Sequence, residues 1–307
     1  MGTLDIERVS VAKSEALFLK RLLQKFNEEQ HKQIQEQLTI SQTNEHSKRV
    51  RETYWNIKPV RADLQDQRVS LTPNEHSEIK RSLEAGANLV TIDFHRSSSD
   101  VHSSLEIIHH FIQESSTRLD KKVPAIMIQV GSISSQTLMT VGSYMFRNAE
   151  YLLGMRSAPY LLLHGIDSYR TARLWKEMIC FAEDELSLVN GTVKAAVVID
   201  ESNWRECDEI LFELRKHCAG LRVSIENFDQ ESMIVQNTIH VGHMRGAHVL
   251  CVWKFGNVSE VDARSTAITG FDGMCITKPS DMKKVKHIWN LVMPESNQIW
   301  KKRNREC

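Results

Sequence analysis

Short apolar segments alternate along this chain with longer segments whose apolar residues recur every three or four positions. Each short segment is nearly continuous in apolar character, as in residues 87–94. A strand buried on both faces has this pattern, whereas the longer periodic pattern predicts a helix. Seven strands are predicted in this way, at residues 87–94, 125–130, 160–166, 195–200, 221–225, 247–253 and 274–277.

Helices are predicted between most of these strands and before the first of them. The sequence Thr72-Pro73-Asn74-Glu75 has a capping residue, a proline at the first helical position and a glutamate, which predicts a helix start. Gly86 predicts the end of that helix. Nearer the N-terminus, residues 14–37 begin with apolar residues at helical spacing, and residues 36–51 are polar enough to predict a loop or a frayed connector.

Strands that alternate with helices at this spacing predict a parallel sheet, and this number of units predicts a TIM-type (β/α)8-like barrel. One stretch is too short for the full plan. Only nineteen residues separate Asn227 from Ala247, and their pattern is that of one helix, Met233 to Met244. A complete strand–helix unit needs about thirty residues. We therefore expect an α/β barrel that lacks one strand–helix unit, preceded by an N-terminal helical segment.

The composition gives no reason to expect a nucleic-acid or membrane partner. Lysine plus arginine and aspartate plus glutamate each number 39 in 307 residues, so no net charge attracts nucleic acid. No apolar run approaches the length of a membrane span, and the N-terminus has no apolar signal core. Six scattered cysteines indicate a reducing compartment, and the terminal Cys307 does not complete a peroxisomal tripeptide. The expected location is cytoplasmic.

One stretch carries a family signature that is only half intact. Residues 211–228 read Leu-Phe-Glu-Leu-Arg-Lys-His-Cys-Ala-Gly-Leu-Arg-Val-Ser-Ile-Glu-Asn-Phe. This resembles malate synthases, in which a helix ending in a basic residue and His leads through Gly-Leu-Asn into a strand closed by Gly-x-Trp-Asp-Tyr. Gly220-Leu221 are retained here. Arg222 replaces the Asn, and Asn227 replaces the Asp that binds magnesium in the family.

Further segments match the same family in order along the chain, roughly from Ser14 to Ile299. The chain is therefore identified as a divergent member of the malate synthase family, A-type. The resemblance implies an N-terminal clasp and connector over residues 1–50, a barrel over 51–300 and a basic tail over 301–307. It also leads us to expect that the family's C-terminal helical domain is absent. The matching segments include 55–69, 86–90, 147–150, 172–175, 191–195, 208–215, 245–248 and 297–299.

In the family, magnesium chelates glyoxylate, an arginine polarises the oxyanions, and a carboxylate base removes a proton from acetyl-CoA. Carried over by position, the metal Glu aligns with Asp200, a carboxylate one methylene shorter, and the metal Asp aligns with Asn227. The family's Arg-Pro-Arg-Gly-Trp aligns with residues 129–133, so Gln129 stands at the first arginine position. The family's Asp-Phe-Glu-Asp aligns with residues 93–96, in which only Asp93 keeps its acid. The general base belongs to the C-terminal domain.

Three neighbouring carboxylates could replace the lost metal ligand, and one of them, Glu201, directly follows Asp200. Glu226 is adjacent to Asn227, but adjacent strand residues face opposite sides, so a one-residue slip would be needed. Asp229 could reach inward from the loop that follows. Magnesium is therefore a candidate cofactor, with Asp200 and Asn227 as its aligned positions.

Three interpretations follow from these substitutions. The first is a malate-synthase-like protein that is catalytically impaired or inactive, a pseudoenzyme retained as a binding or regulatory module. It would keep a site for acetyl-CoA or a glyoxylate-like small acid, or would pair with an active paralogue. The second is an active magnesium-dependent lyase with a site rebuilt around Asp200, Asp229 and Glu226. The third is a non-functional truncated product.

Overall fold

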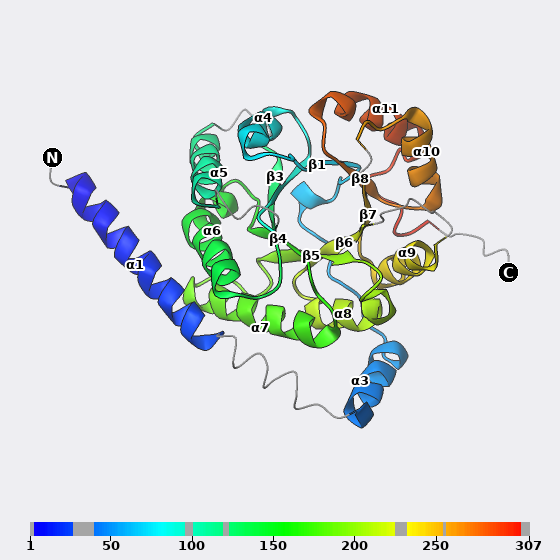
Figure 1. The fold of residues 1–307 in the computed structure, drawn as a ribbon, viewed down its shortest axis with the longest axis horizontal. Helices are drawn as coiled ribbons and strands as arrows, with labels where there is room; N and C mark the ends of the chain where they lie inside the picture. Colours follow the sequence, from blue (N-terminus) through cyan, green and yellow to red (C-terminus); the bar gives the residue numbers. More distant parts are fainter. Residues whose placement is uncertain are drawn as a thin grey trace.

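The computed structural model describes residues 3–26, 40–95, 101–118, 123–224, 232–253 and 256–301. Within them, eight parallel strands pair in chain order and close on themselves into a barrel, with helices around the outside (Figure 1). The strands are β1 Val69–Leu71, β2 Leu89–Asp93, β3 Ala125–Val130, β4 Tyr160–Leu163, β5 Lys194–Ile199, β6 Cys218–Ser224, β7 Val249–Val252 and β8 Gly273–Ile276. The α-helices are α1 Thr3–Lys25, α3 Ile40–Glu52, α4 Ile79–Glu84, α5 Val101–Ser116, α6 Ser135–Gly154, α7 Tyr169–Glu185, α8 Cys207–Leu214, α9 Met233–Arg245, α10 Glu260–Thr269 and α11 Met282–Val292.

The prediction that the barrel lacks one strand–helix unit is wrong. β1 pairs with both β2 and β8 and closes the barrel. The pattern analysis missed it because it is only three residues long and carries a serine, Ser70, at its centre. The single helix predicted between β6 and β7 is confirmed as α9. The barrel is therefore complete, and the eighth strand, which the sequence pattern did not predict, is the short β1.

Two other predictions need correction. The helix predicted to start at Thr72-Pro73 starts later, with a 3-10 turn at His76–Glu78 followed by α4. The N-cap residue of that turn is Glu75, whose backbone is extended. Residues 40–52, predicted as loop or connector, form α3. α3 is stabilised by contact with the barrel rather than by an apolar stripe of its own, since it packs against α8.

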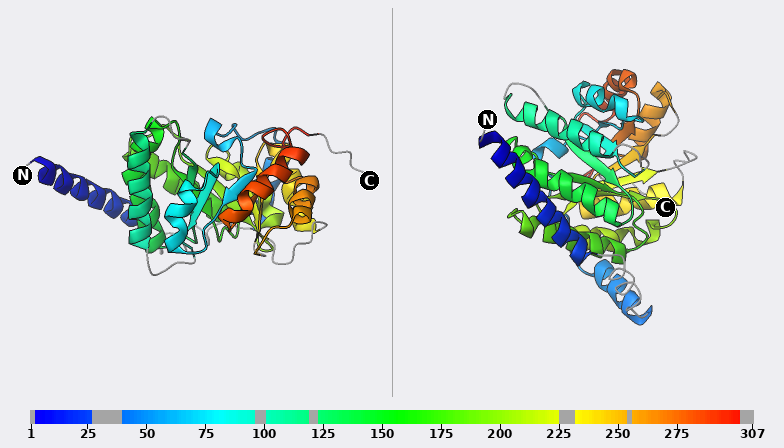
Figure 2. Two further views of the ribbon diagram at one scale, coloured as in Figure 1. Left: turned by 90° about the horizontal axis from the view of Figure 1, so that it is seen from above. Right: turned by 60° about the vertical axis from the view of Figure 1, so that its left-hand side comes forward.

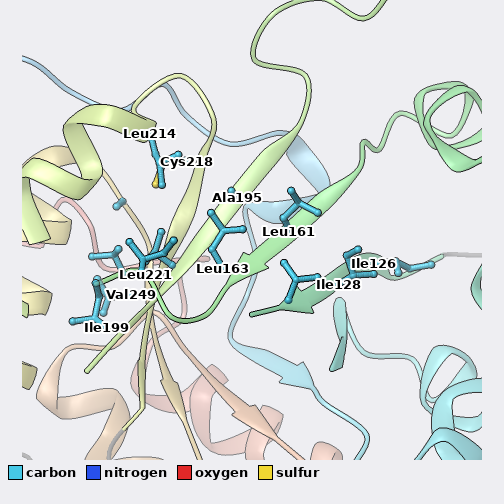
Figure 3. Packing of buried hydrophobic residues seen from close by; sticks show 14 of the residues in the cluster. Ile126, Ile128, Leu161, Leu163, Ala195, Ile199, Leu214, Cys218, Leu221 and Val249 are labelled. Atoms are coloured by element: carbon cyan, nitrogen blue, oxygen red, sulfur yellow. The ribbon is translucent and has the colours of Figure 1, made fainter. Parts of the chain in front are cut away.

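Side chains of the strands alternate between two hydrophobic layers. Outward-facing residues such as Ile126, Ile128, Leu161 and Leu163 pack into the layer between strands and helices (Figure 3). Inward-facing residues, among them Met127, belong to a separate cluster that fills the barrel. Period-two alternation on buried strands gives this division, because successive side chains point to opposite faces.

A segment before β1 closes the N-terminal end of the barrel. Val60 and Leu64 pack with the inward-facing side chains of the strands. Asp63, beside them, accepts hydrogen bonds from the hydroxyls of Tyr160 and Ser157, with oxygen–oxygen distances of 2.7 to 2.8 Å. Burial and the Asp63 carboxylate both raise the pKa of the Tyr160 hydroxyl. With this end closed, polar groups at the opposite, C-terminal end of the strands remain as the place for a site.

Helices α1 and α3 lie outside the ring of barrel helices, and the first turns of α1 project beyond it (Figures 1 and 2). α1 packs on α6, where the ring of Phe18 stacks on that of Phe146 with centroids 5.9 Å apart. Arg147 donates from Nε to both oxygens of Glu15, at 2.8 and 3.0 Å. None of the described helices is long and apolar enough to cross a membrane.

Candidate functional site at the mouth of the barrel

Polar side chains gather at the C-terminal ends of β2 and β3, where these two strands run side by side. Asp93, the last residue of β2, is the register partner of Gln129 in β3. Gln129 Nε2 donates a hydrogen bond to Asp93 Oδ2 at 3.2 Å, and the backbone N–H of His95 donates to Asp93 Oδ1 at 2.8 Å. Both side chains are half-buried. The structure thus brings two of the predicted site residues together, as an acid held by a neutral amide.

The two loops beside this pair place a stack of imidazole rings over the mouth. The rings of His95 and His164 lie 4.3 Å apart, with 23° between their planes. The ring of His95 also occupies the space in which a side chain on Gly131 would begin. Gly131 stands at the second arginine position of the aligned segment. The position is therefore without a cation, and its space is already filled by His95.

Asp200 follows β5, two strands further around the mouth. Its Oδ1 accepts hydrogen bonds from the backbone N–H of Ser202 at 2.8 Å and from the Ser202 hydroxyl at 2.6 Å. Asn203 fixes the turn, because its amide nitrogen donates to the carbonyls of Ile166 and Val198 while its oxygen accepts from Asp200 N–H. Asp200 is half-buried. Its second oxygen, Oδ2, has no hydrogen bond among those within the described part of the chain.

The remaining predicted site residues, Asn227, Glu226 and Asp229, lie outside the described residues. A magnesium site prefers about six oxygen ligands in octahedral geometry. Within the described ranges, the mouth brings no group of three metal-ligating side chains together; the only such group there is Cys180, Glu183 and His217. Asp200 therefore suits one position in the coordination of magnesium, and the described residues do not complete the site.

The group Cys180, Glu183 and His217 lies away from the mouth, near the N-terminal ends of the strands. Glu183 accepts from the backbone N–H groups of Gly191 and Val193, and its Oε2 lies 3.0 Å from His217 Nε2. Both oxygens of this fully buried acid are thus engaged in holding the loop before β5. We interpret the group as structural.

Sequence reasoning missed the role of one residue inside the barrel. Arg222 was noted as a substitution, but the structure places its side chain within the barrel with 2% of its surface exposed. Its guanidinium donates from Nη2 to the sulfur of Met127 at 3.3 Å. The signal available in the sequence was a single arginine within an apolar strand pattern, Leu221-Arg222-Val223.

The fold and the position of these polar groups define an α/β barrel of the kind that carries its site at the C-terminal ends of the strands. Residues 121–232 match a sequence model described as "Malate synthase, TIM barrel domain". The chain is 32% identical over 203 residues to a malate synthase of Myxococcus xanthus, covering 57% of this chain and 38% of that one. It is 28% identical over 200 residues to malate synthase A of Escherichia coli, covering 56% and 38%. Residues 121–232 thus match the malate synthase barrel, and the chain is similar to malate synthases over rather more than half of its length.

Solved structures agree at the level of fold. A Haloferax volcanii malate synthase solved as a magnesium/glyoxylate complex superposes with a TM-score of 0.60 at 11% identity, covering 72% of this chain and 75% of that one. A Burkholderia xenovorans citrate lyase superposes with a TM-score of 0.55, also at 11% identity, covering 78% and 79%. At such identities the likeness shows the barrel and nothing of the chemistry. The chain spans less than two fifths of the length of the first curated relatives.

Proposed function

We propose that this chain binds a small 2-oxo acid such as glyoxylate at the mouth of its barrel and does not condense it with acetyl-CoA at an enzymatic rate. It would act as a binding or regulatory member of the malate synthase family. The observation that carries the proposal is the pair Asp93–Gln129, in which a neutral amide stands at the aligned arginine position.

A neutral amide differs from an arginine in what it can stabilise. Condensation of an enolate with an aldehyde builds negative charge on oxygen, and a fixed cation or hydrogen-bond donor stabilises that charge. Loss of one such donor costs roughly 3 kcal/mol, or about a hundredfold or more in rate. Gln129 is further committed to Asp93, so its amide N–H faces an acid of the protein itself. Gly131 supplies no replacement, because His95 fills its side-chain space.

Asp200 is the residue that we expect to bind magnesium in this protein. Bound there, magnesium would neutralise the carboxylate of the acid and polarise its aldehyde oxygen. The Ser202 hydroxyl and N–H hold Oδ1 of Asp200 in place, and the turn fixed by Asn203 holds its backbone. A single aspartate is a weak magnesium site by itself. The acid should therefore bind together with the metal, each increasing the affinity for the other.

A second candidate function is an active magnesium-dependent lyase. The observation that favours it is the retention of carboxylates on both sides of the mouth, Asp93 at the end of β2 and Asp200 after β5. In that case one of these acids would take the role of the base. The hydrogen bond from Gln129 to Asp93 works against this role, because it occupies the Oδ2 atom that would accept the proton.

Calorimetric titration of magnesium, with and without glyoxylate, tests the binding half of the proposal. We expect heat that depends on glyoxylate in the wild-type protein and its loss in Asp200→Asn. Asp184→Asn is the matched control, since Asp184 is an exposed aspartate in the last turn of α7. Magnesium binding that survives in Asp200→Asn would contradict a binding site at the mouth. The absence of heat from a folded wild-type protein would contradict it as well.

A further inference from the structure

Arg222 lies in the middle of the barrel rather than at its mouth. It faces inward from β6, where its register partners are Val198 in β5 and Leu250 in β7. In an eight-stranded barrel, inward side chains from alternate strands form layers of four. Following the register around the barrel from β2 to β8, the layer that contains Arg222 is completed by Thr91, Leu162 and Cys275. Arg222 is therefore surrounded by barrel side chains on every side.

The guanidinium of Arg222 has no anionic partner in this layer. Among the residues that the structure describes, no carboxylate forms an ion pair or a hydrogen bond with it. Its one hydrogen bond goes to the thioether of Met127, a weak acceptor, and its Nε has no partner. Burial lowers the pKa of the Arg222 guanidinium, partly opposed by the nearby Cys275 thiol.

Two hydroxyl groups nearby are also without partners. The hydroxyl of Thr91, in the same layer, is buried and has no hydrogen-bond partner in the described part of the chain. The same holds for Ser70 of β1, which faces inward and pairs in register with Cys275. Ser70, Thr91 and Cys275 are small for barrel-interior positions, which are dominated by bulky branched residues. The layers around Arg222 thus combine a cation, two free O–H donors and small side chains.

Burying these three donors costs free energy unless a bound species accepts hydrogen bonds from them. A buried charge without a partner costs several kcal/mol even after the protein relaxes, and each buried hydroxyl without a partner costs about 1–3 kcal/mol. A water molecule could satisfy the hydroxyls but would leave the charge uncompensated. An anion satisfies all three groups, because every one of them can donate a hydrogen bond to it.

We propose that the barrel holds one small monovalent anion, of the size of chloride or formate, bound by Arg222 together with the hydroxyls of Ser70 and Thr91. This site is separate from the acid site proposed at the mouth. It lies deeper in the barrel, uses other residues and requires neither magnesium nor acetyl-CoA. Either site can therefore fail without the other.

The thermal unfolding midpoint tests the proposal when measured against sodium chloride or sodium formate. Ionic strength is kept constant with sodium gluconate, whose anion is too large for the site. Wild-type protein should show a rise that grows with the logarithm of the anion concentration above the dissociation constant and reaches roughly 5 °C at a hundredfold excess. Arg222→Met should show no such rise. Arg264→Met removes an exposed arginine on α10 and should behave like the wild type.

Thr91→Val provides a second readout that keeps the arginine and the shape of the layer. It should raise the anion concentration needed for a given midpoint shift about tenfold, the effect of one lost hydrogen bond to a charged group. If Arg222→Met does not fold, Thr91→Val decides the question. An absent rise in the wild-type protein, or an equal rise in Arg222→Met, would overturn the proposal. So would a Thr91→Val variant that needs no more anion than the wild type for the same midpoint shift.

Discussion

The imidazole of His95 lies where the first carbon of a side chain on Gly131 would have to be. These residues belong to the loops after β2 and β3, which meet at the mouth of the barrel. The two positions are therefore in steric contact. Where the aligned family segment has an arginine, this chain has a glycine, and the ring of His95 from the neighbouring loop occupies the space.

Gly131→Arg should destabilise the protein by up to about 1 kcal/mol, because the exposed ring of His95 can make room only by leaving its stack on His164. His95→Ala in the same chain should recover most of that loss, because it removes the ring that the new side chain meets. Urea unfolding of the single and double variants measures both effects. Gly154→Arg is the matched control, since a side chain there meets nothing within 4 Å. Equal losses at positions 131 and 154 would show that His95 does not fill the space.

Arg245 connects the N-terminal segment to the barrel. It donates from Nε and Nη2 to both oxygens of Asp208, each at 2.8 Å, and it reaches the carbonyls of Val50 and Trp55. Its guanidinium also lies 4.2 Å from the centre of the Trp55 ring. The group therefore holds α8, α9, the end of α3 and the residues that follow it together.

Arg245→Met should cost about 3–5 kcal/mol of unfolding free energy, because it leaves Asp208 as a buried, unpaired acid. Arg21→Met is the control. Arg21 forms an ion pair with Glu185 at 2.8 Å but keeps 53% of its side chain exposed, and such pairs are worth about 0.2–1 kcal/mol. Chemical denaturation of both variants gives the comparison. A loss of unfolding free energy in Arg245→Met no larger than that in Arg21→Met would contradict this role of Arg245.

The fold was predictable from the sequence because seven of the eight strands are buried on both faces and read as apolar runs. Gly220 shows why part of the signature was kept. Its φ is +133°, and a side chain there would meet the carbonyl oxygen of His248 at 2.7 Å. β1 and α3 were not predictable in the same way. A three-residue strand is too short to show a hydrophobic period. α3 depends on contacts with residues far away in sequence.

Alignment singled out Asp93, Gln129 and Asp200 as candidate residues, and the structure places them at the C-terminal ends of β2 and β3 and directly after β5. Their contacts were not predictable. The ring stack of His95 and His164 could not be predicted, since it depends on two loops that follow different strands. The side chains that surround Arg222 could not be predicted either. A sequence shows that a strand carries an arginine but not which side chains face it.

Glu213 should make the stability of the protein depend on pH. Burial alone raises its pKa, but hydrogen bonds and charge from Arg173 and Lys176 hold the pKa below its usual value. Arg173 Nη2 and Lys176 Nζ lie 2.7 and 3.1 Å from its oxygens. A lowered pKa means that the folded state prefers the carboxylate. This contribution to stability is present above the ordinary value of 4.5 and is lost as the pH falls through the lower folded value.

Glu213→Gln should therefore be less stable than the wild type at pH 7, and the difference should shrink as the pH falls below about 4.5. Unfolding midpoints of both proteins from pH 7 to pH 3 give this difference directly. Glu177→Gln, at an exposed position of the same helix as Arg173 and Lys176, is the control and should show a small difference throughout. A difference that is constant or grows towards acid would contradict the assignment.

The central claim is that the mouth binds its acid without condensing it, and release of free CoA thiol measures this most directly. Purified wild-type protein is mixed with magnesium, glyoxylate and acetyl-CoA, with an active malate synthase assayed in parallel. We predict thiol release no faster than in the mixture without protein, from a sample in which calorimetry has shown glyoxylate binding. Turnover near the enzyme median of about 10 per second would contradict the account and establish a rebuilt lyase.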